Sequence, residues 1–132
     1  VFAGRTILLV GVPGAFTPTC HEAHIPGFVR GADAIKGRGV DAVAVVAVND
    51  CHVMRAWAES LGVAGEVEFL ADGSATFARA TGLAIDMIGE GLGIRLRRFG
   101  MIVDDGVVRV LNLEPDSSEV TVSGADAMTE AG

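Results

Sequence analysis

The sequence predicts an α/β fold in which helices flank a central mixed sheet. Two runs, Thr6 to Val12 and Asp41 to Asn49, are dominated by apolar residues, as is typical of strands buried on both faces. A stretch with helical spacing follows each run. Later, Asp104-Asp105-Gly106 separates two more apolar runs, and an Asp-Gly pair between strands indicates a tight antiparallel hairpin. Alternating strands and helices predict the parallel part of the sheet, and the hairpin adds antiparallel strands.

The first two helices have recognisable signals at their ends. We expect helical structure from about Cys20 with a kink at Pro26, because a proline lacks the N–H that continues the helical ladder. The Gly37-Arg38-Gly39 segment should stop this helix. Asp50 can cap the second helix by accepting a backbone hydrogen bond. The apolar face of the second helix consists of Val53, Met54, Trp57 and Leu61.

The second half of the chain contains shorter elements. A strand from Glu66 to Leu70 precedes a short helix that Ser74 can cap and Gly82 can close. The glycine-rich segment 82–93 predicts a flexible loop. Its stretch Gly89-Glu90-Gly91-Leu92-Gly93 fails the context test for a dinucleotide-binding turn, because it follows no clear strand and opens no clear helix. The last elements are strands from Leu96 to Val103 and from Val107 to Leu113, and an amphipathic helix from Ser123 to Ala131. This order is the one expected of a thioredoxin-like fold.

Length and composition restrict the function. A chain of 132 residues fits one domain, 1–132. The net charge of −7 argues against a nucleic-acid partner, which would favour a basic face. The longest apolar run, Ala42 to Val48, is too short to cross a bilayer, so we expect no membrane partner. Two cysteines do not make the disulfide pattern of a secreted domain, which favours a reducing, cytoplasmic compartment.

The most informative stretch is Pro13-Gly14-Ala15-Phe16-Thr17-Pro18-Thr19-Cys20, between the first strand and the first helix. Its two prolines restrict the backbone, and Gly14 allows it to bend. Cys20 falls near a helix start, where outward N–H groups and the positive end of the dipole stabilise a thiolate and lower the pKa of the thiol. Thr17 can place a hydroxyl beside the sulfur. From these residues alone, a reactive thiol and an inert buried cysteine both stay open.

This motif, PGAFTPTC, resembles the active-site signature of the peroxiredoxins, and the following His24-Ile25-Pro26-Gly27-Phe28 is similar to the peroxiredoxin-5 subfamily, also called type II. The similarity continues in Val48-Asn49-Asp50, Trp57, Leu70-Ala71-Asp72-Gly73, Arg97-Arg98-Phe99, Val103 to Val108 and Leu111 to Glu114. The resemblance implies a thiol-dependent peroxidase with a thioredoxin-like fold that reduces hydrogen peroxide and alkyl hydroperoxides as a homodimer, without a metal or organic cofactor. Members usually carry a further N-terminal segment, so we expect one before Val1, where any organellar targeting signal would lie.

The resemblance also assigns roles to individual residues of the motif. Cys20 is the peroxidatic nucleophile, whose thiolate attacks the O–O bond and becomes a sulfenic acid. The Thr17 hydroxyl both donates and accepts hydrogen bonds, and it would hold the peroxide together with the Cys20 N–H. Pro13, Gly14 and Phe16 form the substrate pocket, with Pro13 shielding the sulfur.

Three arginines lie close together, and the resemblance selects Arg98, just before Phe99, as the one that reaches Cys20. Its guanidinium is always charged and presents a fork of donors, which suits both a thiolate and the leaving oxygen. On a regularly alternating strand, Arg97 would face the opposite way into solvent, and Arg95 would share the face of Arg98 only after a register break.

The resolving step departs from the family pattern. Some members carry a second cysteine near the position of Val122 and others near Val45, and both positions are valines here. The other thiol, Cys51, either has no partner or resolves the Cys20 sulfenic acid after local unfolding. If Cys51 is inert, an external thiol must finish the cycle, and the resemblance favours glutaredoxin with glutathione, with thioredoxin second.

Other interpretations are weaker. The chain could be a redox-sensing or interaction protein that uses Cys20 as a peroxide signal without efficient turnover, or a thioredoxin-like domain with an inert thiol. A zinc site would have to draw on Cys20, His21, His24, Cys51 and His52. No pair among them has the tight spacing of structural zinc sites, so we expect no metal. We interpret His24 as a structural or pocket-edge residue.

Overall fold

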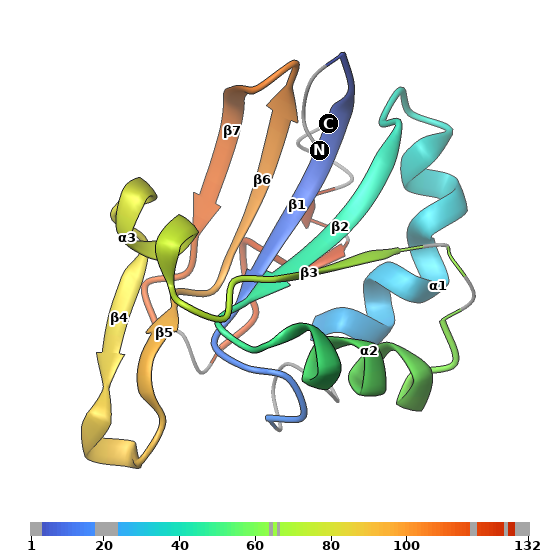
Figure 1. Ribbon diagram of the computed structural model, residues 1–132. Coiled ribbons are helices and arrows are strands. Elements are labelled where there is room, and N and C mark those ends of the chain that lie inside the picture. The colour runs from blue at the N-terminus through green and yellow to red at the C-terminus, as the bar shows by residue number, and fades with distance from the viewer. Residues whose placement is uncertain are drawn as a thin grey trace.

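The computed structural model describes residues 4–17, 24–63, 65, 67–116, 119–125 and 127–128. A five-stranded sheet lies at its centre, in the order β3-β2-β1-β6-β7 (Figure 1). Its strands are β1 (Thr6–Val12), β2 (Ala42–Ala47), β3 (Glu68–Ala71), β6 (Phe99–Asp104) and β7 (Val107–Leu113). β1, β2 and β3 are parallel, whereas β6 runs antiparallel to β1, and β7 antiparallel to β6. The prediction of a mixed sheet is confirmed.

Helices cover both faces of this sheet. They are α1 (Ile25–Lys36), α2 (Cys51–Ser60) and α3 (Thr76–Thr81). Alternate residues of β1 face two separate cores, which explains why its sequence is apolar throughout. Leu8, Val10 and Val12 pack with residues of α1 and α2, whereas Ile7 and Leu9 pack with α3. Within the described part of the chain, no helix has the length and apolar character needed to cross a membrane.

The first two helices begin where helix chemistry allows. α1 begins at Ile25, and Pro26 lies in its first turn, where a missing N–H costs no helical hydrogen bond. The expected helical stretch from Cys20, and with it any kink at Pro26, involves residues 20–23, which lie outside the described residues. Asp50 caps α2 as predicted, because its Oδ1 accepts a hydrogen bond of 2.8 Å from the Val53 N–H.

The cap of α3 differs from the expectation. Ser74 makes no cap, and Ala75, which precedes the helix, has a left-handed conformation with φ of 58°. The carboxylate of Asp72 instead accepts hydrogen bonds of 3.0 Å from the N–H groups of Phe77 and Ala78. A carboxylate stabilises these helix-start N–H groups better than a hydroxyl does, because it is charged.

The glycine-rich segment 82–93 is not a loop, so that prediction is wrong. It contains the antiparallel strands β4 (Ala84–Met87) and β5 (Gly93–Leu96), joined through the short helix η2 (Ile88–Glu90). Gly91 and Gly93 have φ values of 77° and 71°, a conformation that side chains disfavour. The glycines that suggested a loop are therefore the residues that allow the hairpin to turn.

The strand expected from Leu96 to Val103 is interrupted. β5 ends in the small two-stranded sheet, and β6 begins at Phe99 in the large one, so Arg97 and Arg98 connect two sheets. The Arg98 carbonyl accepts a hydrogen bond of 3.0 Å from the Glu114 N–H, which fixes the connection. Regular alternation of the arginine side chains therefore does not apply here.

The predicted C-terminal helix, Ser123 to Ala131, falls partly outside the described residues. Within them, the Met128 N–H donates to the Gly124 carbonyl at 3.0 Å, which is a helical hydrogen bond. The Met128 side chain is buried in the core that α1 and α2 share with β1. This contact anchors Met128 to the sheet.

Candidate active site

Two hydrogen bonds hold the loop that follows β1. The Ala15 N–H donates to Asn49 Oδ1 at 2.9 Å, and the Thr17 hydroxyl donates to the Gly14 carbonyl at 2.8 Å. Between them, Phe16 adopts a left-handed conformation with φ of 64°, and about half of its side chain is exposed. These bonds fix the described part of the PGAFTPTC motif at the end of β1.

Cys20 lies outside the described residues, but both flanks of its segment are described. Thr17 precedes the segment and His24 follows it. On the neighbouring strand, Phe99 pairs with Gly11, so Arg98 lies at the end of the sheet from which the motif loop starts. Arg98 is almost completely buried, with 1% of its surface exposed.

The side chain of Arg98 contacts the ring of His24. The two atoms Arg98 Nη1 and His24 Nδ1 are 2.7 Å apart, and His24 Nε2 lies 2.9 Å from the Ser123 carbonyl oxygen. An arginine only donates, so Nδ1 accepts, and the ring proton on Nε2 is donated to Ser123. Burial, with the positive charge of Arg98 adding to it, lowers the pKa of His24 to about 4, so the ring is neutral at pH 7.

A buried carboxylate holds the segment that receives His24. The Glu114 oxygens accept hydrogen bonds of 2.6–2.8 Å from the backbone N–H and the hydroxyl of both Thr121 and Ser123. Burial raises the pKa of Glu114, but these four donors outweigh it and lower the pKa to about 2. The charged carboxylate therefore fixes Thr121 and Ser123, and the carbonyl of Ser123 accepts the hydrogen bond from His24 Nε2.

The other two arginines differ from Arg98. Arg95 donates through Nε to the Leu92 carbonyl and through Nη1 to the Val48 carbonyl, both at 2.7 Å. Its Nη1 would lie 3.5 Å from a Cβ added at Gly14, so this side chain reaches the motif loop. Arg97 is half-buried rather than fully solvated, and its Nε is buried without a hydrogen-bond partner among the described residues.

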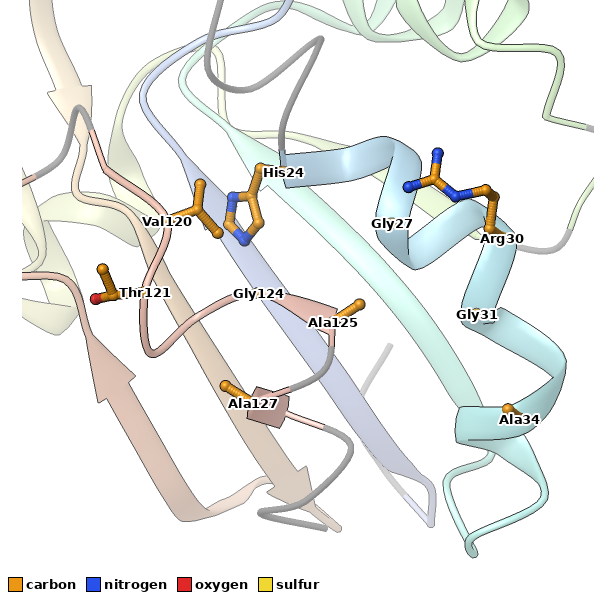
Figure 2. A pocket seen from close by; sticks show the side chains of 10 residues that line it. All are labelled: His24, Gly27, Arg30, Gly31, Ala34, Val120, Thr121, Gly124, Ala125 and Ala127. Atoms are coloured by element: carbon orange, nitrogen blue, oxygen red, sulfur yellow. The ribbon is translucent and has the colours of Figure 1, made fainter.

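An open cavity of about 600 Å³ lies between α1 and a segment that contributes Val120, Thr121, Gly124, Ala125 and Ala127. Figure 2 shows the residues that line it. His24 and Thr121 line it, together with Arg30 and the small residues Gly27, Gly31 and Ala34 of α1. Residues 13–17 do not line it, so it lies beside the His24 contact rather than at the described part of the motif.

Cys51 is exposed and is the first residue of α2. Its relation to Cys20 lies outside the described residues. No group of three or more histidine, cysteine or acidic side chains within the described ranges has an arrangement that would hold a metal ion. Cys20 and His21 belong to the part that is not described.

Three residues near the motif were assigned no chemical role from the sequence: His24, Asn49 and Arg95. Two of them lie in segments that carry the family resemblance, HIPGF and VND, and that was the available signal. The sequence allowed Arg95 to share the face of Arg98 only after a register break, and the chain does break between β5 and β6. The contacts that give each residue its place join segments far apart in the chain.

The comparisons with known proteins agree on one family. The family model described as Redoxin matches residues 1–129. Peroxiredoxin-2C of Oryza sativa subsp. japonica is 47% identical over 129 residues, which cover 98% of this chain and 79% of that protein. The chloroplastic Peroxiredoxin-2E-2 of the same organism is 49% identical, and the match covers 98% of this chain and 58% of that protein.

The solved structures give the same result. The crystal structure of reduced Prx3 from Vibrio vulnificus matches with a TM-score of 0.93 and 48% identity, over 98% of this chain and 82% of that one. The fold is therefore thioredoxin-like, as predicted. The chain belongs to the redoxin family and, within it, to the peroxiredoxins, which are thiol-dependent peroxidases.

Proposed function

We propose that Cys20 is the peroxidatic residue of this enzyme. Its thiolate attacks one oxygen of a peroxide ROOH, the O–O bond breaks, and Cys20 keeps that oxygen as a sulfenic acid. The other oxygen leaves as RO⁻ and takes up a proton to give water or an alcohol. The cysteine sulfur is oxidised by two electrons and the peroxide is reduced by two.

The burial and position of Arg98 give the main support for this proposal. A buried, permanently charged guanidinium at the sheet end where the PGAFTPTC loop begins can stabilise a thiolate and the charge on the leaving oxygen. Thr17 supports it from the loop: its hydroxyl already donates to the Gly14 carbonyl, so its oxygen lone pairs are left to accept a hydrogen bond from the O–H of the peroxide.

The substrates we propose are hydrogen peroxide and organic hydroperoxides. Pro13 and Gly14 are buried at the base of the loop, and the half-exposed Phe16 places an aromatic ring at its rim. The Phe16 ring packs against buried Trp57 with a centroid distance of 6.4 Å. An apolar rim favours an alkyl group on the substrate.

The reductant we propose is an external thiol. The exposed Cys51 sits at the start of α2 and lacks the position of either family resolving cysteine. Glutathione attacks the Cys20 sulfenic acid, which gives a mixed disulfide and water, and glutaredoxin exchanges that disulfide. Thioredoxin is the second choice. We further propose a single-domain, homodimeric, cytoplasmic enzyme, although two of its relatives are chloroplastic.

A panel of three variants tests the assignment. Cys20→Ser should abolish peroxide reduction, Cys51→Ser should leave it largely intact, and Arg98→Ala should slow peroxide attack by about 100-fold. The rate is measured by stopped flow on the reduced protein in the absence of a reductant. Full activity of Cys20→Ser would rule out the proposal.

Intact mass after one equivalent of hydrogen peroxide separates the two routes of recycling. A trappable oxygen adduct on Cys20 with Cys51 free supports the external thiol. A loss of two hydrogens that maps to Cys20 and Cys51 within one chain would make Cys51 the resolving cysteine, and thioredoxin would then become the favoured reductant.

A further inference from the structure

The His24 ring joins two parts of the chain that are far apart in sequence. Its Nδ1 accepts from Arg98 at 2.7 Å and its Nε2 donates to the Ser123 carbonyl at 2.9 Å. His24 and Arg98 are each 1% exposed, and Ser123 is fully buried. We propose that His24 is a positioning residue for Arg98, a neutral acceptor that sets the direction of the guanidinium at the active site. This inference rests on the proposed role of Arg98.

A neutral acceptor has a specific advantage at this place. A carboxylate that bonded Arg98 here would also cancel much of its positive charge in a buried site. An imidazole fixes the same N–H donor but leaves that charge available to a thiolate and a leaving oxygen. His24 lies four residues after Cys20 in the chain, so the group that directs Arg98 belongs to the same segment as the nucleophile.

The two charged groups near the His24 ring act on it from opposite sides. Arg98 faces Nδ1, and Glu114 acts on the ring from the side of Ser123. The Glu114 carboxylate accepts four hydrogen bonds, from the N–H groups and the hydroxyls of Thr121 and Ser123, and so it fixes the residue whose carbonyl receives the His24 proton. The Glu114 carboxylate, the Ser123 peptide, the neutral His24 ring and the Arg98 guanidinium therefore follow one another. The His24 ring lies between the negative and the positive charge.

Two substitutions of similar size separate the functions of the two ring nitrogens. In His24→Asn, Oδ1 lies one bond beyond Cγ, as Nδ1 does, so the acceptor for Arg98 is kept and the donor to Ser123 is lost. In His24→Gln, the terminal amide lies two bonds beyond Cγ, as Nε2 does, so the donor to Ser123 is kept and the acceptor is lost. A role that is only structural would make the two variants equally impaired.

We expect His24→Gln to lower the second-order rate constant with hydrogen peroxide by about tenfold or more, and His24→Asn to stay within about threefold of the wild type. The pKa of Cys20, measured from the pH dependence of its alkylation by iodoacetamide, should rise in His24→Gln and change little in His24→Asn. Melting temperatures establish that both variants are folded. Equal rate losses in the two variants would overturn the inference.

A double-mutant cycle separates the inference from the proposed function. If His24 acts through Arg98, adding His24→Gln to Arg98→Ala causes no further loss of rate. If Arg98→Ala itself is fully active, the proposed function of Arg98 fails. If Arg98→Ala is slow and the His24→Gln loss simply adds to it, the role of Arg98 stands and the positioning inference fails.

The wild-type protein provides a measurement that needs no variant. Long-range ¹H–¹⁵N NMR spectra distinguish a protonated from an unprotonated ring nitrogen. At pH 7 we expect His24 to be neutral with its proton on Nε2 and with Nδ1 unprotonated. A proton on Nδ1 would contradict the inference, because Nδ1 could then accept nothing from Arg98.

Discussion

Asn49 Oδ1 accepts a hydrogen bond of 2.9 Å from the backbone N–H of Ala15, and this bond joins the loop after β1 to the loop after β2. The two strands are parallel neighbours, so both loops leave the same end of the sheet. The side chain of Asn49 therefore supplies the acceptor for the Ala15 N–H from a neighbouring loop.

Asn49→Ala removes this acceptor. A polar N–H that loses its partner costs about 1–3 kcal/mol, so we expect the loop to shift and the rate constant with hydrogen peroxide to fall about tenfold. Asp50→Ala is the matched control, because it removes the cap of α2 from the adjacent position and leaves Ala15 bonded. The control should lose stability and keep its rate. Equal rates for the two variants would show that the Ala15 bond does not shape the site.

Arg95 also contacts the loop after β2, through the Val48 carbonyl. The bond from Arg95 Nη1 ties the β4–β5 hairpin to the Val48 carbonyl, next to Asn49, and the bond from Nε to the Leu92 carbonyl stays within the hairpin. We expect Arg95→Ala to lower both the melting temperature and the peroxide rate, but less than Arg98→Ala lowers the rate. Arg97→Ala should be nearly neutral, because the Nε that it removes is buried without a partner among the described residues. A wild-type rate for Arg98→Ala would move the catalytic role to Arg95 or Arg97.

The sequence predicted the elements whose signals are local. β1 and β2 could be identified because both of their faces are buried, and Asp50 could be identified as a cap because it directly precedes its helix. The α3 cap could not, because Ala75 is left-handed and the chain brings Asp72 rather than Ser74 to the helix start. A glycine count could not separate a loop from a hairpin whose turn needs glycines.

The site was predicted unevenly for the same reason. Thr17 and Arg98 could be named from motifs, and their catalytic roles remain predictions. The partners of Arg98 could not be named, because the bond to His24 spans 74 residues of sequence and the bond from His24 to Ser123 spans 99. Such long-range hydrogen bonds leave no periodic pattern in the sequence from which they could be predicted.

Gly11 lies where β1 passes the ring of Phe99, its partner in β6. A Cβ at Gly11 would lie 2.0 Å from a ring carbon, so Gly11→Ala forces a buried aromatic ring to move. We expect a loss of about 3 kcal/mol in the free energy of unfolding. The control, Gly31→Ala, lies inside α1, where a Cβ would have its nearest neighbour at 4.0 Å, and should gain about 0.5–1 kcal/mol. Urea unfolding measures both, and a stable Gly11→Ala would contradict this packing.

Glu114 should make the stability of the enzyme depend on pH in the acid range. Its pKa is lowered from 4.5 to about 2 in the folded state, so the folded state binds fewer protons than the unfolded state between these values. The stabilisation is complete above pH 4.5 and is lost as the pH falls through about 2. At 1.36 kcal/mol per pKa unit it amounts to about 3 kcal/mol.

Glu114→Gln removes this contribution, because an amide has a single acceptor oxygen and turns an N–H group toward the donors of Thr121 and Ser123. At pH 7 we expect the variant to be less stable than the wild type by about 3 kcal/mol, and the difference to shrink as the pH falls from 4.5 toward 2. His24, whose pKa is lowered to about 4, also destabilises both proteins as the pH falls from 6.5 to 4. The charge of Glu114 raises the His24 pKa, so this effect is larger in the variant and widens the difference in stability rather than shrinking it. Urea unfolding at a series of pH values gives the two curves. A difference that stays constant over this range would mean that the four hydrogen bonds to Glu114 do not depend on its charge.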